Sequence, residues 1–224
     1  MKLYMNPASA PSRAIMLFVA ETGIEMDTCV IDLSTGEQCG PEFLAINPNG
    51  LVPVLEDGDF ILTEGAAILR YLVEKSGSPM YPSDLQQRAR INEAIDWFNS
   101  NLYRDVAFNL TYPQIFDHHH RRSAEGTAAA VAWGQEASVR WLRVLDEHLL
   151  GDEADYLCLG RLTIADLFGA CLLSVADLVR FDLSEYPNIV RWLGNVSALS
   201  SWDAVNAGFR GLVDSLCDPK FIAA

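Results

Sequence analysis

The chain has 224 residues, of which half are hydrophobic, and it carries a formal net charge of −14 at neutral pH. A chain of this length and composition can bury a substantial core, so it is predicted to be globular, as one domain or two small ones. The acidic balance and the scattered Lys and Arg side chains argue against a nucleic acid or an anionic membrane surface as partner, because phosphate binding requires clustered positive charge.

The five cysteines favour a reducing compartment over a disulfide-stabilised secreted protein. Their number is odd, and no two of them form a C-x-x-C pair. No apolar run approaches the length of a membrane span, and Met1-Lys2 leads directly into a strand-like segment instead of a long apolar leader. We therefore expect a cytoplasmic protein without a membrane partner.

The N-terminal third alternates strand-like and helix-like segments. Residues 2–5 are predicted to be a strand, a turn-prone loop follows, and residues 12–22 form an amphipathic helical run that ends at Gly23. Residues 26–33 predict a second strand, parallel to the first, and residues 41–45 a short helical turn.

A predicted hairpin follows, and a proline lies inside it. Residues 51–55 and 60–62 are expected to form two strands joined by the turn Asp57-Gly58. Pro53 removes a ladder donor from the first of these strands. One explanation is an edge strand that tolerates proline. The other is a cis Val52-Pro53 bond, which would turn the backbone of Val52 outward to pair with an extended, peptide-like ligand.

The hairpin leads into a helix whose start favours an amino-acid ligand. Glu64-Gly65 precedes the helical run 66–72, so an acidic side chain and unpaired backbone N–H groups stand together at a helix N-terminus. The N–H groups favour a carboxylate, and Glu64 can accept hydrogen bonds from an ammonium group. The pair therefore predicts recognition of a zwitterion.

The rest of the chain is predicted to be helical. Residues 76–82 are rich in turn formers, and Ser83 or Asp84 can cap the helix that follows. Helical runs cover roughly residues 84–108, 123–150, 163–180, 187–197 and 201–213. Thr163 and Asp166 have the spacing of a capping box, which we interpret as structural and not catalytic.

These segments resemble the glutathione-binding part of the soluble glutathione transferases, and the resemblance spans the whole chain. It implies a thioredoxin-like domain over residues 1–77, a linker over 78–85 and an all-helical domain with the electrophile pocket over 86–224. In that family the strand before the cis-proline pairs with the cysteinyl backbone of glutathione, and the helix start holds its γ-glutamyl group. These places are taken by Val52, Pro53, Glu64 and Gly65. Gly65 resembles the bacterial beta class, whereas theta and delta enzymes carry serine there.

The loop from Tyr4 to Arg13, YMNPASAPSR, resembles the delta and theta type, including bacterial dichloromethane dehalogenases. In those enzymes the serine at the place of Ser9 activates the thiol. Without the resemblance, an ordinary loop or N-cap serine would be the simpler interpretation. Ser12 is a second candidate, with capping or packing of the helix as its alternative role. Ala10 stands where the beta class has cysteine, so mixed-disulfide chemistry is not expected from this loop.

The same resemblance assigns positions for the far end of glutathione and for a partner subunit. Gln38 stands where theta and delta enzymes use histidine for the glycyl carboxylate. Leu51 replaces a lysine or glutamine, which leaves that carboxylate with one polar partner fewer. Asn99 matches the beta-class asparagine that reaches glutathione across the dimer interface, and it implies a homodimer.

Tyr103, Phe108, Tyr112 and Phe116 are candidate walls of the electrophile pocket, with ordinary core packing as the alternative. The run from Asp117 to Arg122 contains three consecutive histidines. Consecutive residues of a helix point in different directions, and no nearby cysteine or carboxylate pair completes a metal site. We therefore expect no metal and interpret the run as a solvated break between helices.

The sequence thus predicts a glutathione transferase, with glutathione as co-substrate and a small hydrophobic or halogenated electrophile as the second substrate. Two alternatives remain. One is a glutathione-dependent dehalogenase or isomerase. The other is a non-catalytic binding or regulatory protein of the same fold, which Leu51 and the missing serine at Gly65 favour slightly.

Overall fold

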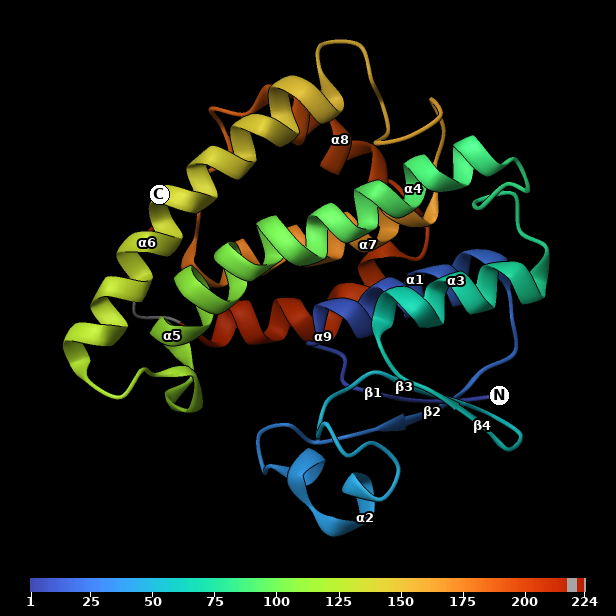
Figure 1. The fold of residues 1–224 in the computed structure, drawn as a ribbon, viewed down its shortest axis with the longest axis horizontal. Coiled ribbons are helices and arrows are strands. Elements are labelled where there is room, and N and C mark those ends of the chain that lie inside the picture. The colour runs from blue at the N-terminus through green and yellow to red at the C-terminus, as the bar shows by residue number, and fades with distance from the viewer. Residues whose placement is uncertain (217–220, 224) are drawn as a thin grey trace.

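The computed structural model describes residues 1–216 and 221–223; Cys217 lies outside the described residues. The N-terminal part is a four-stranded sheet with helices on both faces, and the rest is helical (Figure 1). Its elements are β1 Lys2–Met5, α1 Ala10–Thr22, β2 Asp27–Val30, η1 Glu37–Cys39, α2 Pro41–Leu44, β3 Val54–Asp57, β4 Phe60–Leu62 and α3 Gly65–Ser76. The predicted order of strands and helices is confirmed.

The sheet has the strand order β2-β1-β3-β4, so β1 and β3 are its central strands. β1 pairs with β2 in parallel, as predicted, and with β3 in antiparallel orientation. The prediction that β3 begins at Leu51 is wrong. The strand begins at Val54, because Pro53 has no N–H to contribute to the ladder. β3 then continues to Asp57, which pairs with Phe60, so the turn is Gly58-Asp59 and not Asp57-Gly58.

Helices cover both faces of the sheet, and β1 is buried between them. In Figure 1, α1 and α3 lie on one face and α2 lies on the other. Leu3 and Met5 join the core beneath α1 and α3. Tyr4 points to the opposite face, where it packs with Phe43 of α2 and with Val54. This alternation is the two-residue period of a strand that is buried on both sides.

The second part contains no strand among the described residues, in agreement with the sequence. Its segments are α4 Leu85–Trp97, η2 Phe98–Leu102, η3 Arg104–Thr111, α5 Tyr112–Ile115, η4 Asp117–His119, α6 Ala124–Arg143, η5 Val144–Leu150, α7 Ile164–Leu173, η6 Ser174–Val179, α8 Pro187–Ser197 and α9 Trp202–Ser215. The first helical path continues to Ile115, beyond the predicted end at Phe108. Pro113 does not stop it, because it lies in the first turn of α5, where its missing N–H is not needed.

α7 lies at the centre of the helical part, and all its residues are buried. The predicted capping box is confirmed: the Thr163 amide and hydroxyl donate to the Asp166 carboxylate at 2.8 and 2.9 Å. The same carboxylate accepts the Leu157 amide at 2.8 Å and the Trp192 indole N–H at 3.0 Å. Burial raises the pKa of Asp166, and these hydrogen bonds oppose the shift. Asp166 therefore organises the start of α7.

α1 joins the two parts, because it contacts α3 on one side and α7 and α9 on the other (Figure 1). One continuous hydrophobic core runs through this contact. Asp84 caps α4 by accepting the Gln87 amide at 2.9 Å, which confirms one of the two predicted caps. None of the described helices is both long enough and apolar enough to cross a membrane.

Candidate active site

Ser9 lies in the loop between β1 and α1, which Asn6 holds in place. The Asn6 side chain donates to the Ile31 carbonyl at 2.8 Å and accepts the Ala8 amide at 2.9 Å, and the Ser9 amide donates to the Asn6 carbonyl at 3.0 Å. Ser9 occupies the N-cap position of α1, with φ −69° and ψ 122°, but its hydroxyl makes no capping hydrogen bond. The hydroxyl is therefore not committed to the helix.

Ser12, the alternative serine, points into the core. It is fully buried, and its hydroxyl accepts the Asn6 amide N–H at 3.5 Å. Ala10 is also buried, with 2% of its surface exposed. Ser9 is thus the serine of this loop whose side chain is only half-buried at the helix N-terminus.

The Val52-Pro53 peptide bond is cis, as the second of the two sequence interpretations predicted. The pairing of Val52 with a ligand stays a prediction. β1 and β3 are antiparallel, and Tyr4 pairs with Val54 at one end of their ladder. The Val52-Pro53 bond precedes β3 at this end of the sheet, and the loop that carries Ser9 follows β1 at the same end.

Glu64 and Gly65 form the start of α3, which meets the start of α1. Glu64 is the N-cap residue; it is exposed, has φ 66° and ψ 113°, and makes no side-chain capping bond. A Cβ atom on Gly65 would lie 2.8 Å from the Cβ atom of Pro11, so the two helix starts are in close contact. Two sets of unpaired N–H groups, with the positive ends of two helix dipoles, are thereby brought together.

Gln38 lies beside the turn that precedes Val52. Its carbonyl oxygen is 3.2 Å from a Cβ atom placed on Gly50, and the φ of 63° at Gly50 favours glycine. The side-chain Oε1 of Gln38 is buried and has no hydrogen-bond partner among the described residues. Leu51 is 63% exposed at the same turn. The structure thus places Gln38 near the turn before Val52. We call the region formed by Ser9, Gln38, Val52, Glu64 and Gly65 the Ser9 corner.

Tyr103, Phe108, Tyr112 and Phe116 form one aromatic cluster across η3 and α5. The hydroxyls of Tyr103 and Tyr112 are 2.9 Å apart, and the Phe108 ring lies edge-on to both rings, with centroid distances of 5.5 and 5.2 Å. Phe116 follows at 5.6 Å from Tyr112. Phe108 is 42% exposed, so ordinary core packing does not account for it.

The histidine run is a short turn with exposed His118 and His120, as predicted, but His119 is part of the aromatic cluster. Its ring lies 5.1 Å from Tyr112 and 5.6 Å from Phe108. Burial lowers the pKa of His119, and His118 and Arg121 act in the same direction. In the described part of the chain, no group of three or more His, Cys, Asp or Glu side chains is placed to hold a metal ion.

Arg13, one helical turn after Ser9, is a functional candidate that was not predicted from the sequence. This side chain is only 1% exposed. Its guanidinium donates to the side chain of Asn206, to the Ser174 hydroxyl at 2.9 Å and to the Cys171 carbonyl at 3.3 Å. Burial lowers its pKa. A charged residue on the buried face of an amphipathic helix was the available signal, but the partners are too distant in sequence to be inferred.

Arg13 also lies against an aromatic ring of α9 and acts electrostatically on Tyr103. Its guanidinium carbon lies 3.9 Å from the centroid of the Phe209 ring in α9. Burial raises the pKa of Tyr103, and the hydrogen bond to Tyr112 and the charge of Arg13 oppose that shift. The positive charge of Arg13 is therefore close enough to oppose the rise in the pKa of Tyr103.

Asn99, the residue predicted to serve a partner subunit, lies in the helical part of the chain. It is exposed on η2, while Phe98 before it is buried.

Comparison with known families accounts for both parts of the chain. The model of the glutathione S-transferase N-terminal domain matches residues 1–74, and that of the glutathione S-transferase C-terminal domain matches residues 103–200. The chain belongs to the glutathione S-transferase family. The predicted fold class, a thioredoxin-like domain followed by a helical glutathione S-transferase domain, is thereby confirmed.

Two curated relatives and one solved structure illustrate the similarity. Glutathione S-transferase D7 of Drosophila melanogaster is 34% identical over 205 residues, which is 90% of this chain and 86% of the relative. Human glutathione S-transferase theta-2B is 34% identical over 209 residues, covering 88% and 81%. The structure of human glutathione transferase theta-2 with glutathione and an unknown ligand matches with a TM-score of 0.83 at 28% identity, covering 99% of this chain and 92% of that one.

The contact between Gly65 and Pro11 predicts that the serine of theta and delta relatives does not fit this chain. In Gly65→Ser the added Cβ would lie 2.8 Å from Pro11, so one helix start must move. We expect a loss of about 1–3 kcal/mol in unfolding free energy, measured by chemical denaturation. Gly211→Ser in α9 is the matched control, because a Cβ there meets nothing within 4 Å. Equal stability of the two variants would contradict the prediction.

Proposed function

We propose that the protein is a glutathione transferase that activates the thiol of glutathione for attack on a small hydrophobic or halogenated electrophile. The observation that carries the proposal is the meeting of two helix starts, at Ser9 and Glu64, beside the cis Val52-Pro53 bond. Family membership supports it, since the two curated relatives are named glutathione S-transferases. The proposed chemistry requires no metal.

The corner offers a partner for each part of glutathione. We assign the backbone of Val52, held before Pro53, to the cysteinyl residue. The exposed Glu64 carboxylate can accept hydrogen bonds from the γ-glutamyl ammonium, and the N–H of Gly65 at the start of α3 can bind the neighbouring carboxylate. Gln38 is assigned to the glycyl end, where its Nε2 can donate to the carboxylate; its buried Oε1, which lacks a partner among the described residues, can accept from a glutathione N–H.

Ser9 supplies the chemistry in this proposal. Its hydroxyl would donate to the glutathione thiolate, and the start of α1 adds partial positive charge. A hydrogen bond to a charged group contributes about 1.5–3 kcal/mol, which lowers a thiol pKa by about one to two units. From about 8.5 for a free thiol, this gives a substantial thiolate fraction at neutral pH. The sulfur then forms a bond to the electrophilic carbon, and the leaving group departs with its electron pair.

The aromatic cluster is the proposed wall of the electrophile pocket. Tyr103, Phe108, Tyr112 and Phe116 present ring faces and edges that suit an apolar substrate. The exposed ring of Phe108 supports this assignment, because a residue that served only the core would be covered. The hydroxyl pair of Tyr103 and Tyr112 adds one polar point to the surface.

A second candidate function is a non-catalytic glutathione-binding protein, because the exposed Leu51 and the close contact at Gly65 both remove polar partners found in relatives. A glutathione-dependent dehalogenase or isomerase would use the same Ser9 and the same thiolate. Conjugation assays with alkyl halides and aryl halides, run beside a direct measurement of glutathione binding, separate these possibilities.

Further proposals concern the domain boundaries, the cellular location and the oligomeric state. We propose a glutathione-binding domain over residues 1–77, a linker over 78–85 and a helical domain over 86–224, in a cytoplasmic homodimer. The exposed position of Asn99 on η2 suits a residue that serves the neighbouring subunit.

The dimer is tested by sedimentation equilibrium across micromolar concentrations. We expect a mass near twice that of the 24.7 kDa chain. A monomer throughout this range would remove both the dimer and the role of Asn99.

The glutathione assignment is tested by calorimetry on Glu64→Gln. Removing the carboxylate charge leaves the γ-glutamyl ammonium with a weaker partner, so we expect affinity to fall about tenfold or more. Glu25→Gln is the matched control, since Glu25 is exposed and outside the corner. If the wild-type protein releases no heat with millimolar glutathione, the proposed zwitterion site does not function.

The catalytic assignment is tested by ultraviolet titration of the bound thiolate in Ser9→Ala and Ser12→Ala. We expect Ser9→Ala to raise the pKa of the bound thiol by about one to two units, with little change in glutathione affinity. Ser12→Ala should not shift it, because Ser12 is buried beneath the loop. An unshifted titration in Ser9→Ala would mean that the helix start or another donor activates the thiol.

A further inference from the structure

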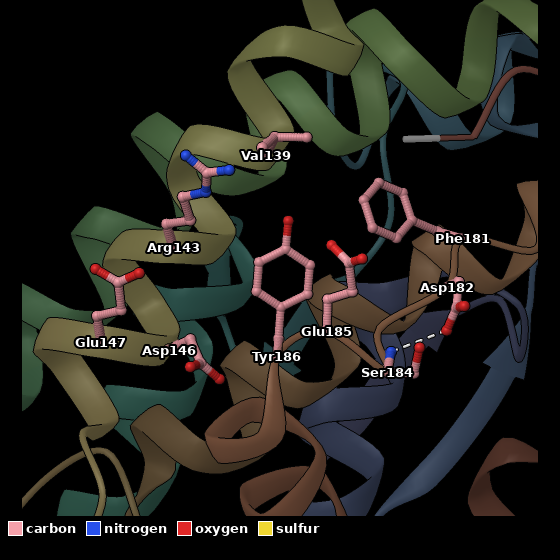
Figure 2. A pocket seen from close by; sticks show the side chains of 9 residues that line it. All are labelled: Val139, Arg143, Asp146, Glu147, Phe181, Asp182, Ser184, Glu185 and Tyr186. Atoms are coloured by element: carbon pink, nitrogen blue, oxygen red, sulfur yellow. Dashed lines mark hydrogen bonds between the residues drawn. The ribbon is translucent and has the colours of Figure 1, made fainter.

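A cavity of about 470 Å³ lies away from the Ser9 corner, between α6 with η5 on one side and the segment that leads from η6 into α8 on the other (Figure 2). Arg143 and Glu147 belong to one wall, Phe181, Asp182 and Glu185 to the other, and Tyr186 stands between them. The volume is within the range of about 300–1,000 Å³ that small-molecule sites occupy. None of the assignments above uses these residues.

Tyr186 directs an unpaired hydroxyl into this cavity. The residue is 9% exposed, and Figure 2 shows its hydroxyl pointing into the space between the two walls. Among the described residues, no group forms a hydrogen bond with this hydroxyl. Burial raises the pKa of Tyr186, so the hydroxyl stays protonated and can donate. The ring is buried, but the oxygen itself reaches the space of the cavity, so a ligand bound there can accept its hydrogen bond in place of water.

The walls carry both signs of charge. Arg143 forms no ion pair or hydrogen bond with the described part of the chain, and the same holds for Glu147 and Glu185. Asp182 accepts the Ser184 amide at 2.8 Å through one carboxylate oxygen. Arg143 on one wall and Glu185 on the other therefore border the cavity with hydrogen-bonding capacity to spare, and Glu147 adds a carboxylate on the side of Arg143.

Asp146 also borders the cavity, but its carboxylate already accepts hydrogen bonds from the protein. Its carboxylate accepts the backbone amides of Asn188 and Ile189 at 2.8 and 3.0 Å, in the first turn of α8. This contact fixes the start of α8 and with it the position of Tyr186, the residue before the helix. The buried Asp146 and its hydrogen bonds therefore hold one side of the cavity in place.

We propose that this cavity binds a small zwitterion, namely an α-amino acid with an apolar or aromatic side chain. The ligand carboxylate would be held by Arg143 and the Tyr186 hydroxyl, and its ammonium by Glu185 with Asp182. Its side chain would lie against Phe181. A simple amine would leave Arg143 unpaired beside a cation, and a simple carboxylate would face the acidic wall. A zwitterion satisfies both walls.

The test is calorimetric titration of L-phenylalanine into the full-length protein saturated with glutathione, which blocks the zwitterion-binding corner at Glu64. We expect saturable binding to the wild type, and binding about tenfold weaker in Arg143→Gln and in Tyr186→Phe. Arg161→Gln is the matched control, an exposed arginine outside the cavity, and it should bind like the wild type. Arg143 is itself exposed and Tyr186→Phe keeps the ring, so both variants should fold.

Two analogues decide the ligand class. Phenylethylamine lacks the carboxylate and 3-phenylpropionate lacks the ammonium, and each should bind at least about tenfold more weakly than L-phenylalanine. Equal binding of either analogue would overturn the proposal, as would unchanged affinity in both cavity variants. Loss of L-phenylalanine binding when glutathione is added would place the amino acid at Glu64 and would also overturn it.

Discussion

The place of the candidate active site depends on the burial of one charge, the guanidinium of Arg13. A buried cation is costly unless its N–H groups are bonded. Here an amide oxygen of Asn206, the hydroxyl of Ser174 and the carbonyl of Cys171 accept from the two terminal nitrogens, whereas the buried Nε has no partner among the described residues. The partners come from α7, η6 and α9, so Arg13 ties α1 to three segments of the helical part at one point. Ser9, one turn earlier, takes its position from that docking.

Close packing at two prolines refines this position. Pro7 and Pro11 flank Ser9, and each packs against a glycine from another helix. A Cβ atom on Gly208 of α9 would lie 2.8 Å from Pro7, and one on Gly65 of α3 would lie 2.8 Å from Pro11. The loop is therefore held between the helical part and the start of α3. This arrangement explains why a glycine begins α3 here: the space that a serine side chain needs is occupied by Pro11.

Local features of this fold could be predicted from the sequence, whereas features that depend on distant partners could not. The box of Thr163 and Asp166 is set by residues within one turn and was found. The cis bond at Pro53 could be proposed because proline is unusual inside a strand. The partners of Arg13 are more than 150 residues away, so only folding brings them together. His119 was missed for a different reason: Tyr112 and Phe108 are near it in sequence, but the contacts depend on how the chain turns after α5.

Helix α6 contributes to both the aromatic wall and the second cavity. Its Trp141 indole donates to the buried Asp105 carboxylate at 2.7 Å, and Asp105 belongs to η3, the segment that carries Phe108. Burial opposes ionisation of Asp105, but the hydrogen bonds from Arg104, Trp141 and other neighbours outweigh it and lower its pKa. Arg143, at the end of the same helix, faces the cavity at Tyr186. α6 thus anchors η3 through a charged hydrogen bond and also supplies the cation of the cavity at Tyr186. The position of α6 therefore affects the geometry of the aromatic wall and of the cavity.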